Sequence, residues 1–170
     1  MKILELLESY FEGLYHISSK ADLTLENLEI RKSVGNEEFQ NFIGKPMYGL
    51  YLAKGLSWHN WASKEKFRET GKDYLYRIKL KPTAKILQIE AGRKVPEEFL
   101  LQPVKIKDYK PPKINYKEIA KKYDGVAASK LSFGTFWDVP SVVVFNKNII
   151  QSIENLGIVA KAIEKTRKLK

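Results

Sequence analysis

The chain has 170 residues, 44% of them hydrophobic and 29% charged, which is typical of a single folded domain and excludes an intrinsically disordered chain. It has no cysteine, which excludes disulfides, thiol nucleophiles and cysteine-based zinc sites. Its two histidines leave a two-His-plus-carboxylate metal site open, but no metal-ligand spacing supports one. Thirty Lys and Arg residues stand against 20 Asp and Glu, and this net charge of +10 favours polyanionic partners.

No apolar run in the sequence reaches the length of a membrane span, and no signal peptide precedes the first predicted helix. We therefore expect a cytoplasmic protein with no membrane partner. No break in composition divides the chain, so we expect one domain over residues 1–170.

The first half of the chain is predicted to mix helices with short strands. Amphipathic spacing predicts a helix at the N-terminus, and short apolar runs bounded by Gly or Pro predict strands. Ser57 is placed to cap the second helix. The expected elements are a helix over Met1–Glu12, a strand at Leu14–Ile17, a loop over Ser18–Glu38, a strand at Met47–Ala53 and a helix from Ser57 to Gly71.

The second half is predicted to be richer in strands. Strands are expected at Asp73–Lys81, Lys85–Glu90, Leu131–Trp137 and Pro140–Phe145, with an irregular connection over Pro96–Pro112. Helices are expected from Asn115 to Tyr123, over Asn146–Asn155 and over Ile158–Lys170, and Asp124-Gly125 is expected to be a turn. Because strands and helices do not alternate regularly, the fold class is α+β with mostly antiparallel pairing.

The common catalytic motifs are missing. The sequence contains no GxGxxG, P-loop, HExxH or GxSxG pattern, which removes support for the usual dinucleotide-binding, kinase, zinc-protease and hydrolase interpretations. Nothing points to a Ser-His-Asp triad.

Three separated segments carry a family resemblance through their order and spacing. The first is Leu14-Tyr15-His16-Ile17-Ser18-Ser19, and the second is Gly49-Leu50-Tyr51-Leu52-Ala53 followed by Ser57, Trp58 and Trp61. The third is Tyr123-Asp124-Gly125-Val126, continued by Val142-Val143-Val144-Phe145-Asn146 and Asn148-Ile149-Ile150.

These segments resemble the signature strands of the ADP-ribosyltransferase fold, in its diphtheria-toxin and poly(ADP-ribose) polymerase branch. The ending is similar to that of small toxin-like and phage-encoded members. The resemblance implies two small, mostly antiparallel sheets that form a central cleft with flanking helices. It covers residues 14–150, between an N-terminal helix (1–13) and a basic C-terminal helix (151–170).

The resemblance also implies roles for individual residues in binding NAD, the substrate. His16 would hold a ribose hydroxyl, and Ile17, which replaces the family's usual glycine, would offer backbone groups to the carboxamide. Tyr51 and Trp61 would enclose the nicotinamide ring, since aromatic faces attract a planar cation. Ser57 and Ser141 would lie near the cofactor.

The closing strand departs from the family pattern. Active members carry a glutamate directly before this strand, and Ser141 stands there in this chain. A neutral serine cannot stabilise the positive charge that develops as nicotinamide leaves. Asp138, three residues earlier, is the candidate replacement, so we place His16, Tyr51 and Asp138 in the catalytic set.

Three functions follow from these observations. The first is NAD-dependent transfer of ADP-ribose to a protein or nucleic acid, with release of nicotinamide. The second is a non-catalytic module of the same fold that binds NAD, ADP-ribose or nucleic acid. The third is a basic nucleic-acid-binding domain unrelated to the resemblance. In each, polyanions could contact Lys161, Lys165, Arg167 and Lys168.

Structural roles remain open for the same residues. His16 and Tyr51 could be ordinary core residues, Ser141 a strand-entry residue, and Asp138 a turn residue. Asp124, which precedes a glycine, is expected to act mainly in the turn.

Overall fold

The computed structural model describes residues 13–30, 46, 48–55, 71–89, 95–101, 114–128 and 140–162. Its strands are β1 (Leu14–Ser18), β2 (Leu50–Lys54), β3 (Tyr74–Leu80), β4 (Ile86–Ile89), β5 (Gly125–Ala128), β6 (Ser141–Val144) and β7 (Ile150–Ile158). Its helical elements are η1 (Glu97–Phe99), α4 (Tyr116–Lys122) and η2 (Lys147–Ile149).

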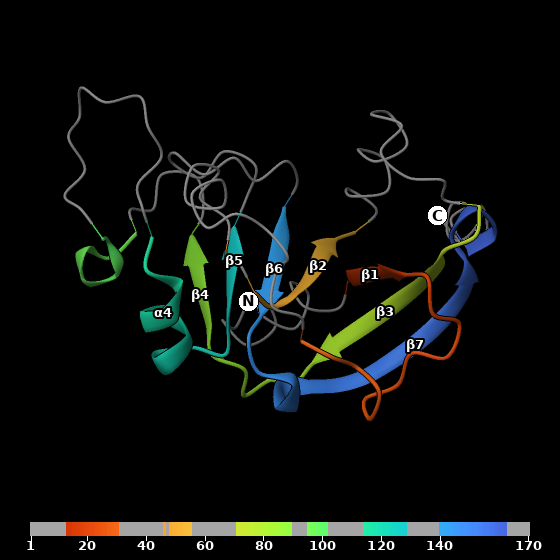
Figure 1. Cartoon of the computed structure of the whole chain (residues 1–170), viewed down its shortest axis with the longest axis horizontal. Helices are drawn as coiled ribbons and strands as arrows, with labels where there is room; N and C mark the ends of the chain where they lie inside the picture. Colours follow the sequence, from red (N-terminus) through yellow and green to blue (C-terminus); the bar gives the residue numbers. More distant parts are fainter. Residues whose placement is uncertain are drawn as a thin grey trace, which may run out of the picture. The chain divides into compact units, whose positions relative to one another are not determined.

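The described strands form one mixed sheet in the order β4-β5-β6-β2-β1-β3-β7 (Figure 1). The α+β class is therefore confirmed at a coarse level, but the predicted pair of sheets around a central cleft is wrong in its sheet count. Pairing is mostly antiparallel, as predicted: of the five strand pairs with a described register, β4 with β5 is parallel and the other four are antiparallel. No described helix is long and apolar enough to cross a membrane.

The chain divides into two compact units. Unit 1 comprises Met1–Leu28, Leu52–Thr83 and Lys147–Lys170, and unit 2 comprises Glu29–Tyr51 and Ala84–Asn146.

In unit 1, β3 lies between β1 and β7, and Figure 1 shows β3 and β7 side by side. The predicted alternation of β3 is confirmed, because Tyr76, Ile78 and Leu80 are buried while Arg77 and Lys79 are exposed. Leu75 is also buried, but on the opposite side of the sheet, where it packs with Val159 and Ala162. Both sides of β3 therefore contribute to packing.

The phenol of Tyr76 fixes the loop that follows β1. Its hydroxyl donates a hydrogen bond to the Lys20 carbonyl (2.8 Å) and accepts bonds from the Leu23 amide and the Asn155 side chain (both 3.2 Å). Asn155 also donates to the Ala21 carbonyl (2.7 Å). One buried tyrosine thus joins the loop to β3 and β7, and it satisfies polar groups that burial would otherwise penalise.

The helix predicted over Asn146–Asn155 is wrong. This segment forms η2 and then β7, a nine-residue strand whose pairing with β3 includes Ile78 opposite Ile153. An isolated helix of about ten residues is marginal in water, so long-range pairing decides the structure here. The predicted C-terminal helix from 151 is corrected likewise: β7 continues to Ile158, and residues 159–162 are helical. The β3–β7 pairing shifts register twice, at Tyr74/Tyr76 and at Lys79/Leu80.

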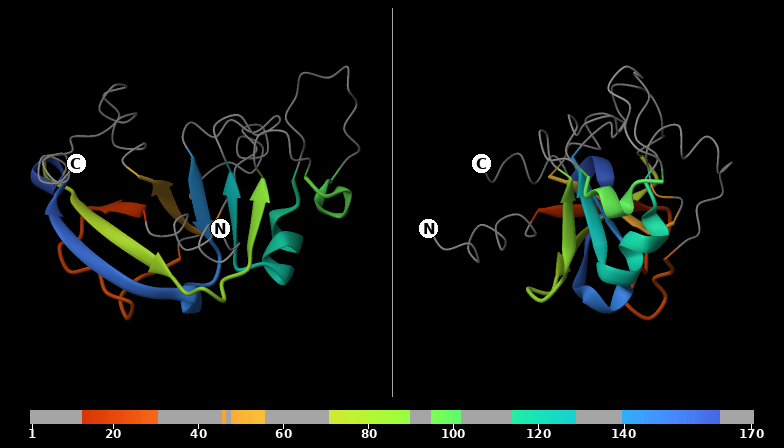
Figure 2. Two further views of the ribbon diagram at one scale, coloured as in Figure 1. Left: turned by 180° about the vertical axis from the view of Figure 1, so that it is seen from behind. Right: turned by 90° about the vertical axis from the view of Figure 1, so that its left-hand side faces the viewer.

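In unit 2, helix α4 packs against one side of β4 and β5 (Figure 2). The side chain of Asn115 accepts a hydrogen bond from the Glu118 amide, which confirms Asn115 as the predicted N-cap. The core of this unit is made of Leu87, Ile89, Val95, Phe99, Ile114, Tyr116, Ile119, Val126, Ala128 and Val143.

Asp124 joins the starts of β4 and β5 to the end of β6. Its amide donates to the Lys85 carbonyl (2.8 Å), and its carboxylate accepts from the Lys85 amide and the Asn146 side chain (both 3.0 Å). Its carbonyl accepts from the Phe145 amide (2.7 Å). The turn role predicted for Asp124 is thus part of a wider connection between three strands.

Gly125 allows the strands to approach closely at this connection. A Cβ atom placed on Gly125 would lie 2.5 Å from the Val143 carbonyl oxygen and 3.0 Å from Ile86 Cδ1. Backbone cannot yield as the end of a flexible side chain can, so the position requires glycine.

The remaining predicted elements divide into two groups. Strands at Leu14–Ile17, Asp73–Lys81, Lys85–Glu90 and Pro140–Phe145 are confirmed, and the strand predicted from Met47 begins at Leu50. The helices over Met1–Glu12 and Ser57–Gly71, the strand at Leu131–Trp137 and most of the Pro96–Pro112 connection fall wholly or largely outside the described residues.

We predict that Gly125→Ala lowers the free energy of unfolding by about 1–3 kcal/mol, because the new methyl group overpacks the junction. Urea denaturation measures the change. Gly71→Ala is the matched control, since a Cβ atom at Gly71 meets no atom within 4 Å. Equal losses in the two variants would contradict the close-approach argument.

We predict that Asp124→Ala lowers the free energy of unfolding by about 1.5–3 kcal/mol, because it leaves the Lys85 amide and the Asn146 side chain without their acceptor. Asp124→Asn, which retains one acceptor oxygen, should lose less. Glu118→Ala is the control, because its exposed ion pair with Lys121 contributes little. If Asp124→Ala lowers the free energy of unfolding no more than this control does, the junction does not depend on the carboxylate.

Candidate functional site

The structure describes part of the predicted NAD site. His16 and Ile17 lie in β1, Tyr51 in β2 and Ser141 at the start of β6. Lys161 is described and exposed. The predicted residues outside the described part of the chain are Ser57, Trp61, Asp138, Lys165, Arg167 and Lys168.

Tyr51 presents an aromatic ring to solvent from the middle of a strand. Its neighbours Leu50 and Leu52 are buried, whereas Tyr51 is 38% exposed. Its hydroxyl donates a hydrogen bond to the Pro46 carbonyl, at 2.5 Å. Desolvation by burial raises the pKa of the Tyr51 phenol well above its usual value of 10.0. The hydroxyl of Tyr51 is thus bonded within the protein, while the residue as a whole stays partly exposed.

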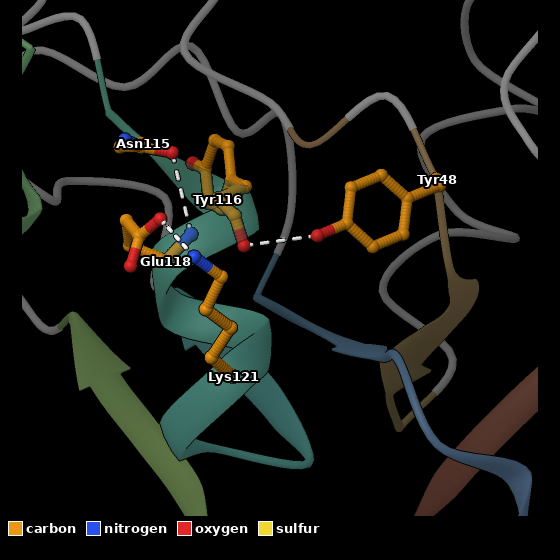
Figure 3. A network of polar contacts seen from close by, with 5 residues as sticks. All are labelled: Tyr48, Asn115, Tyr116, Glu118 and Lys121. Atoms are coloured by element: carbon orange, nitrogen blue, oxygen red, sulfur yellow. Dashed lines mark hydrogen bonds and ion pairs between the residues drawn. The ribbon is translucent and has the colours of Figure 1, made fainter.

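The segment that leads into β2 is anchored by Tyr48, whose role the sequence did not reveal. Its hydroxyl donates to the Tyr116 carbonyl in α4, at 2.9 Å (Figure 3). Its ring lies 5.1 Å from that of Phe145, centroid to centroid. Figure 3 also shows the first turn of α4, where Asn115 caps Glu118 and Lys121 pairs with Glu118.

Gly49 completes this anchor. Its φ of 124° lies in the region that favours glycine, and a Cβ atom there would collide with Val143 Cγ1. The strand with Tyr51 is therefore preceded by a segment held against β6 at Gly49 and against α4 at Tyr48. Together with the bond from Tyr51 to Pro46, these contacts hold the ring of Tyr51 in one orientation.

His16 lies inside unit 1. It is half-buried and stands directly opposite Tyr76 of β3, while Ile17 stands opposite Leu75. Tyr15 and Ile17 pack against the cluster of Leu75, Val159 and Ala162. The Ile17 side chain is thus a packing residue, which agrees with a role limited to its backbone groups.

The register of β1 and β2 fixes which side chains share a side. Tyr15 pairs with Ala53, and Tyr51 lies on the same side of β2 as Ala53, because side chains alternate along a strand. His16 points to the other side of β1. On this register Tyr15, rather than His16, shares the side taken by Ala53. The ribose-binding role of His16 stays a prediction.

Ser141 occupies a structural position. It stands opposite Ala128 of β5, on the side of β6 that carries Val143 and faces the core of unit 2. Its exposed fraction is 9%. This placement agrees with a strand-entry residue and offers no negative charge. Asp138, the other candidate for that charge, lies outside the described residues.

Within the described part of the chain, no group of three or more His, Asp or Glu side chains is placed to hold a metal ion. Asp124 has both carboxylate oxygens bonded in the strand junction.

Comparisons with known proteins found no match: no protein-family model, no curated protein and no solved structure is significantly similar to this chain.

We predict that the wild-type protein loses stability above pH 10 relative to Tyr51→Phe. Because the pKa of Tyr51 is raised in the folded protein, the unfolded chain ionises first, and deprotonation favours unfolding from pH 10 upward. Below pH 10 the contribution of this group is constant. Urea midpoints of the two proteins between pH 8 and about 11 measure the difference, which should grow with pH. Parallel curves would show that the Tyr51 hydroxyl is not desolvated.

Proposed function

We propose that this chain binds NAD as a module of the ADP-ribosyltransferase type, with Tyr51 stacking on the nicotinamide ring. The observation that carries the proposal is the exposed ring of Tyr51 in β2, held by its hydroxyl bond to Pro46. The resemblance of the Gly49–Ala53 segment to the family's strand supports the same residue.

The chemistry of the ring suits this ligand. Oxidised nicotinamide is planar and positively charged, so it gains from an aromatic face through stacking and cation–π attraction. A ring that is already fixed loses little freedom on binding, which reduces the entropic cost of the complex. The Tyr51 phenol is neutral at physiological pH, because its ordinary pKa is 10.0 and burial raises this pKa further.

Transfer of ADP-ribose to a macromolecule is the enzymatic form of this proposal. The bond between nicotinamide and ribose breaks, a nucleophile of the acceptor bonds to the ribose carbon, and the nucleophile's proton is released. A carboxylate must stabilise the positive charge on the ribose. Ser141 is neutral and faces the core of unit 2, so Asp138 is the residue on which this form rests.

We predict that Tyr51→Ala weakens NAD binding about tenfold, as expected for loss of one aromatic–cation contact. Isothermal titration calorimetry with NAD measures the change, and Tyr51→Phe, which keeps the ring, should lose less. Leu101→Ala is the matched control, because Leu101 is another exposed apolar residue of unit 2, at 50%. NAD affinity that is unchanged in Tyr51→Ala would overturn the proposal.

Nicotinamide release separates the enzymatic form from binding alone. The wild type, Asp138→Asn and His16→Ala are assayed together with NAD. Release that is lost in Asp138→Asn supports transfer through that carboxylate, and its loss in His16→Ala, with NAD binding also weakened, supports the ribose role. NAD binding without release supports the non-catalytic module.

A further inference from the structure

One side of the sheet in unit 1 carries a row of cations. Along β3 and just beyond its end, Arg77, Lys79 and Lys81 are exposed, and they alternate with the buried Ile78 and Leu80. Residues two apart on a strand lie about 6.6 Å from each other on one side, a spacing comparable to that of phosphates along an extended single strand.

The neighbouring strands add an aromatic ring and one opposing charge. Tyr15 of β1 stands directly opposite Arg77, and Glu154 of β7 stands opposite Arg77 on the other flank. Tyr15 is half-buried, since it also packs on the cluster that contains Leu75. Lys79 stands opposite the exposed Ser152. Cations, an aromatic ring and a small polar residue thus share one side of the sheet, which Val159 and Ala162 cover at its Leu75 end.

The charges on this side are available to a ligand. Glu154 accepts two hydrogen bonds from Arg77, from Nε at 2.8 Å and from Nη2. Both side chains of this pair are about half exposed, 49% and 51%, and an exposed ion pair contributes little to stability. A phosphate can therefore replace Glu154 on Arg77 at small cost, and the guanidinium suits phosphate geometry. Lys79 has no ion-pair partner among the described residues.

We propose that this side of β1, β3 and β7 binds single-stranded nucleic acid. Phosphates lie on Arg77 and Lys79, and a base stacks on Tyr15. The excess of 30 basic over 20 acidic residues supplies the complementary field. Single-stranded nucleic acid is favoured over an acidic protein because it presents a planar ring beside each phosphate, which matches Tyr15 beside Arg77. This inference does not depend on NAD binding.

Fluorescence anisotropy of the full chain with a labelled oligothymidylate, over a series of salt concentrations, tests the proposal. Lys79→Glu should weaken binding about tenfold and lower the salt slope by about one or more, because it removes a phosphate contact. Tyr15→Leu, which keeps an apolar side chain over the cluster, should weaken binding at least about fivefold through lost stacking. Glu154→Gln should tighten binding about threefold by releasing Arg77 from a competing carboxylate.

Two controls distinguish binding at this surface from a general effect of net charge. Lys117→Glu makes the same change in net charge on an exposed position of α4, and it should leave affinity within about twofold. Lys165→Ala/Arg167→Ala/Lys168→Ala tests the basic C-terminal segment and should also have a small effect. Thermal melting of every variant shows that the fold is retained.

Four results would overturn the proposal. These are equal losses in Lys79→Glu and Lys117→Glu, binding that depends only on the C-terminal triple variant, duplex DNA bound as tightly as the single strand, and polyglutamate competing as well as the unlabelled oligonucleotide. The last result would assign the surface to an acidic protein. Loss of NAD binding in Tyr51→Ala, with oligonucleotide binding intact, keeps the two proposals separate.

Discussion

The junction at Asp124 and Gly125 sets the register on which unit 2 depends. Reciprocal bonds between Asp124 and Lys85 align Ile86 with Gly125, and the bonds to Phe145 and Asn146 align Val144 with the same glycine. A slip of one residue in either pairing would turn every side chain of the strand to the opposite side. The core of this unit therefore depends on the carboxylate of Asp124 and on the absence of a side chain at Gly125.

The same register explains how Tyr51 is presented. Val143 belongs to the core of unit 2, and a Cβ atom at position 49 would collide with its side chain. Only glycine therefore fits at position 49. The Tyr48 hydroxyl bonds to α4, and Tyr51, three residues later, is partly exposed. The two surfaces that we propose for ligands thus lie on strands and not on long loops. Groups on strands hold their positions well, which favours preorganised recognition.

Local signals in the sequence predicted much of the fold. The alternation in Tyr74–Leu80, the apolar run at 141–144 and the cap at Asn115 depend on a few adjacent residues, and all three are confirmed. Sequence reasoning missed β7, because the spacing of its isoleucines also fits a helix. Only the pairing with β3 decides between helix and strand. The single sheet was missed for a similar reason, since strand order is a long-range property.

The candidate site was less accessible to sequence reasoning. Tyr51 could be named, but its exposure depends on an anchor between Tyr48 and Tyr116, 68 residues apart. The sequence showed a serine at position 141 in place of the expected glutamate. It did not show that this serine stands opposite Ala128 and faces the core. The sequence did not single out Tyr15, since only its pairing with Ala53 and Arg77 shows which side of the sheet it takes.

The position of β7 has a consequence for behaviour in concentrated solution. Among the described strands β7 has one neighbour, and a long flat strand at such an edge would be a template on which further chains could stack. The two register shifts against β3 interrupt the regular pairing of β7, and the Gly157 amide donates to the Asn155 side chain. Glu154 adds a charge that repeated stacking would bring close to its copies. The irregularities that fit β7 to its neighbour also make it a poor seed for fibrils.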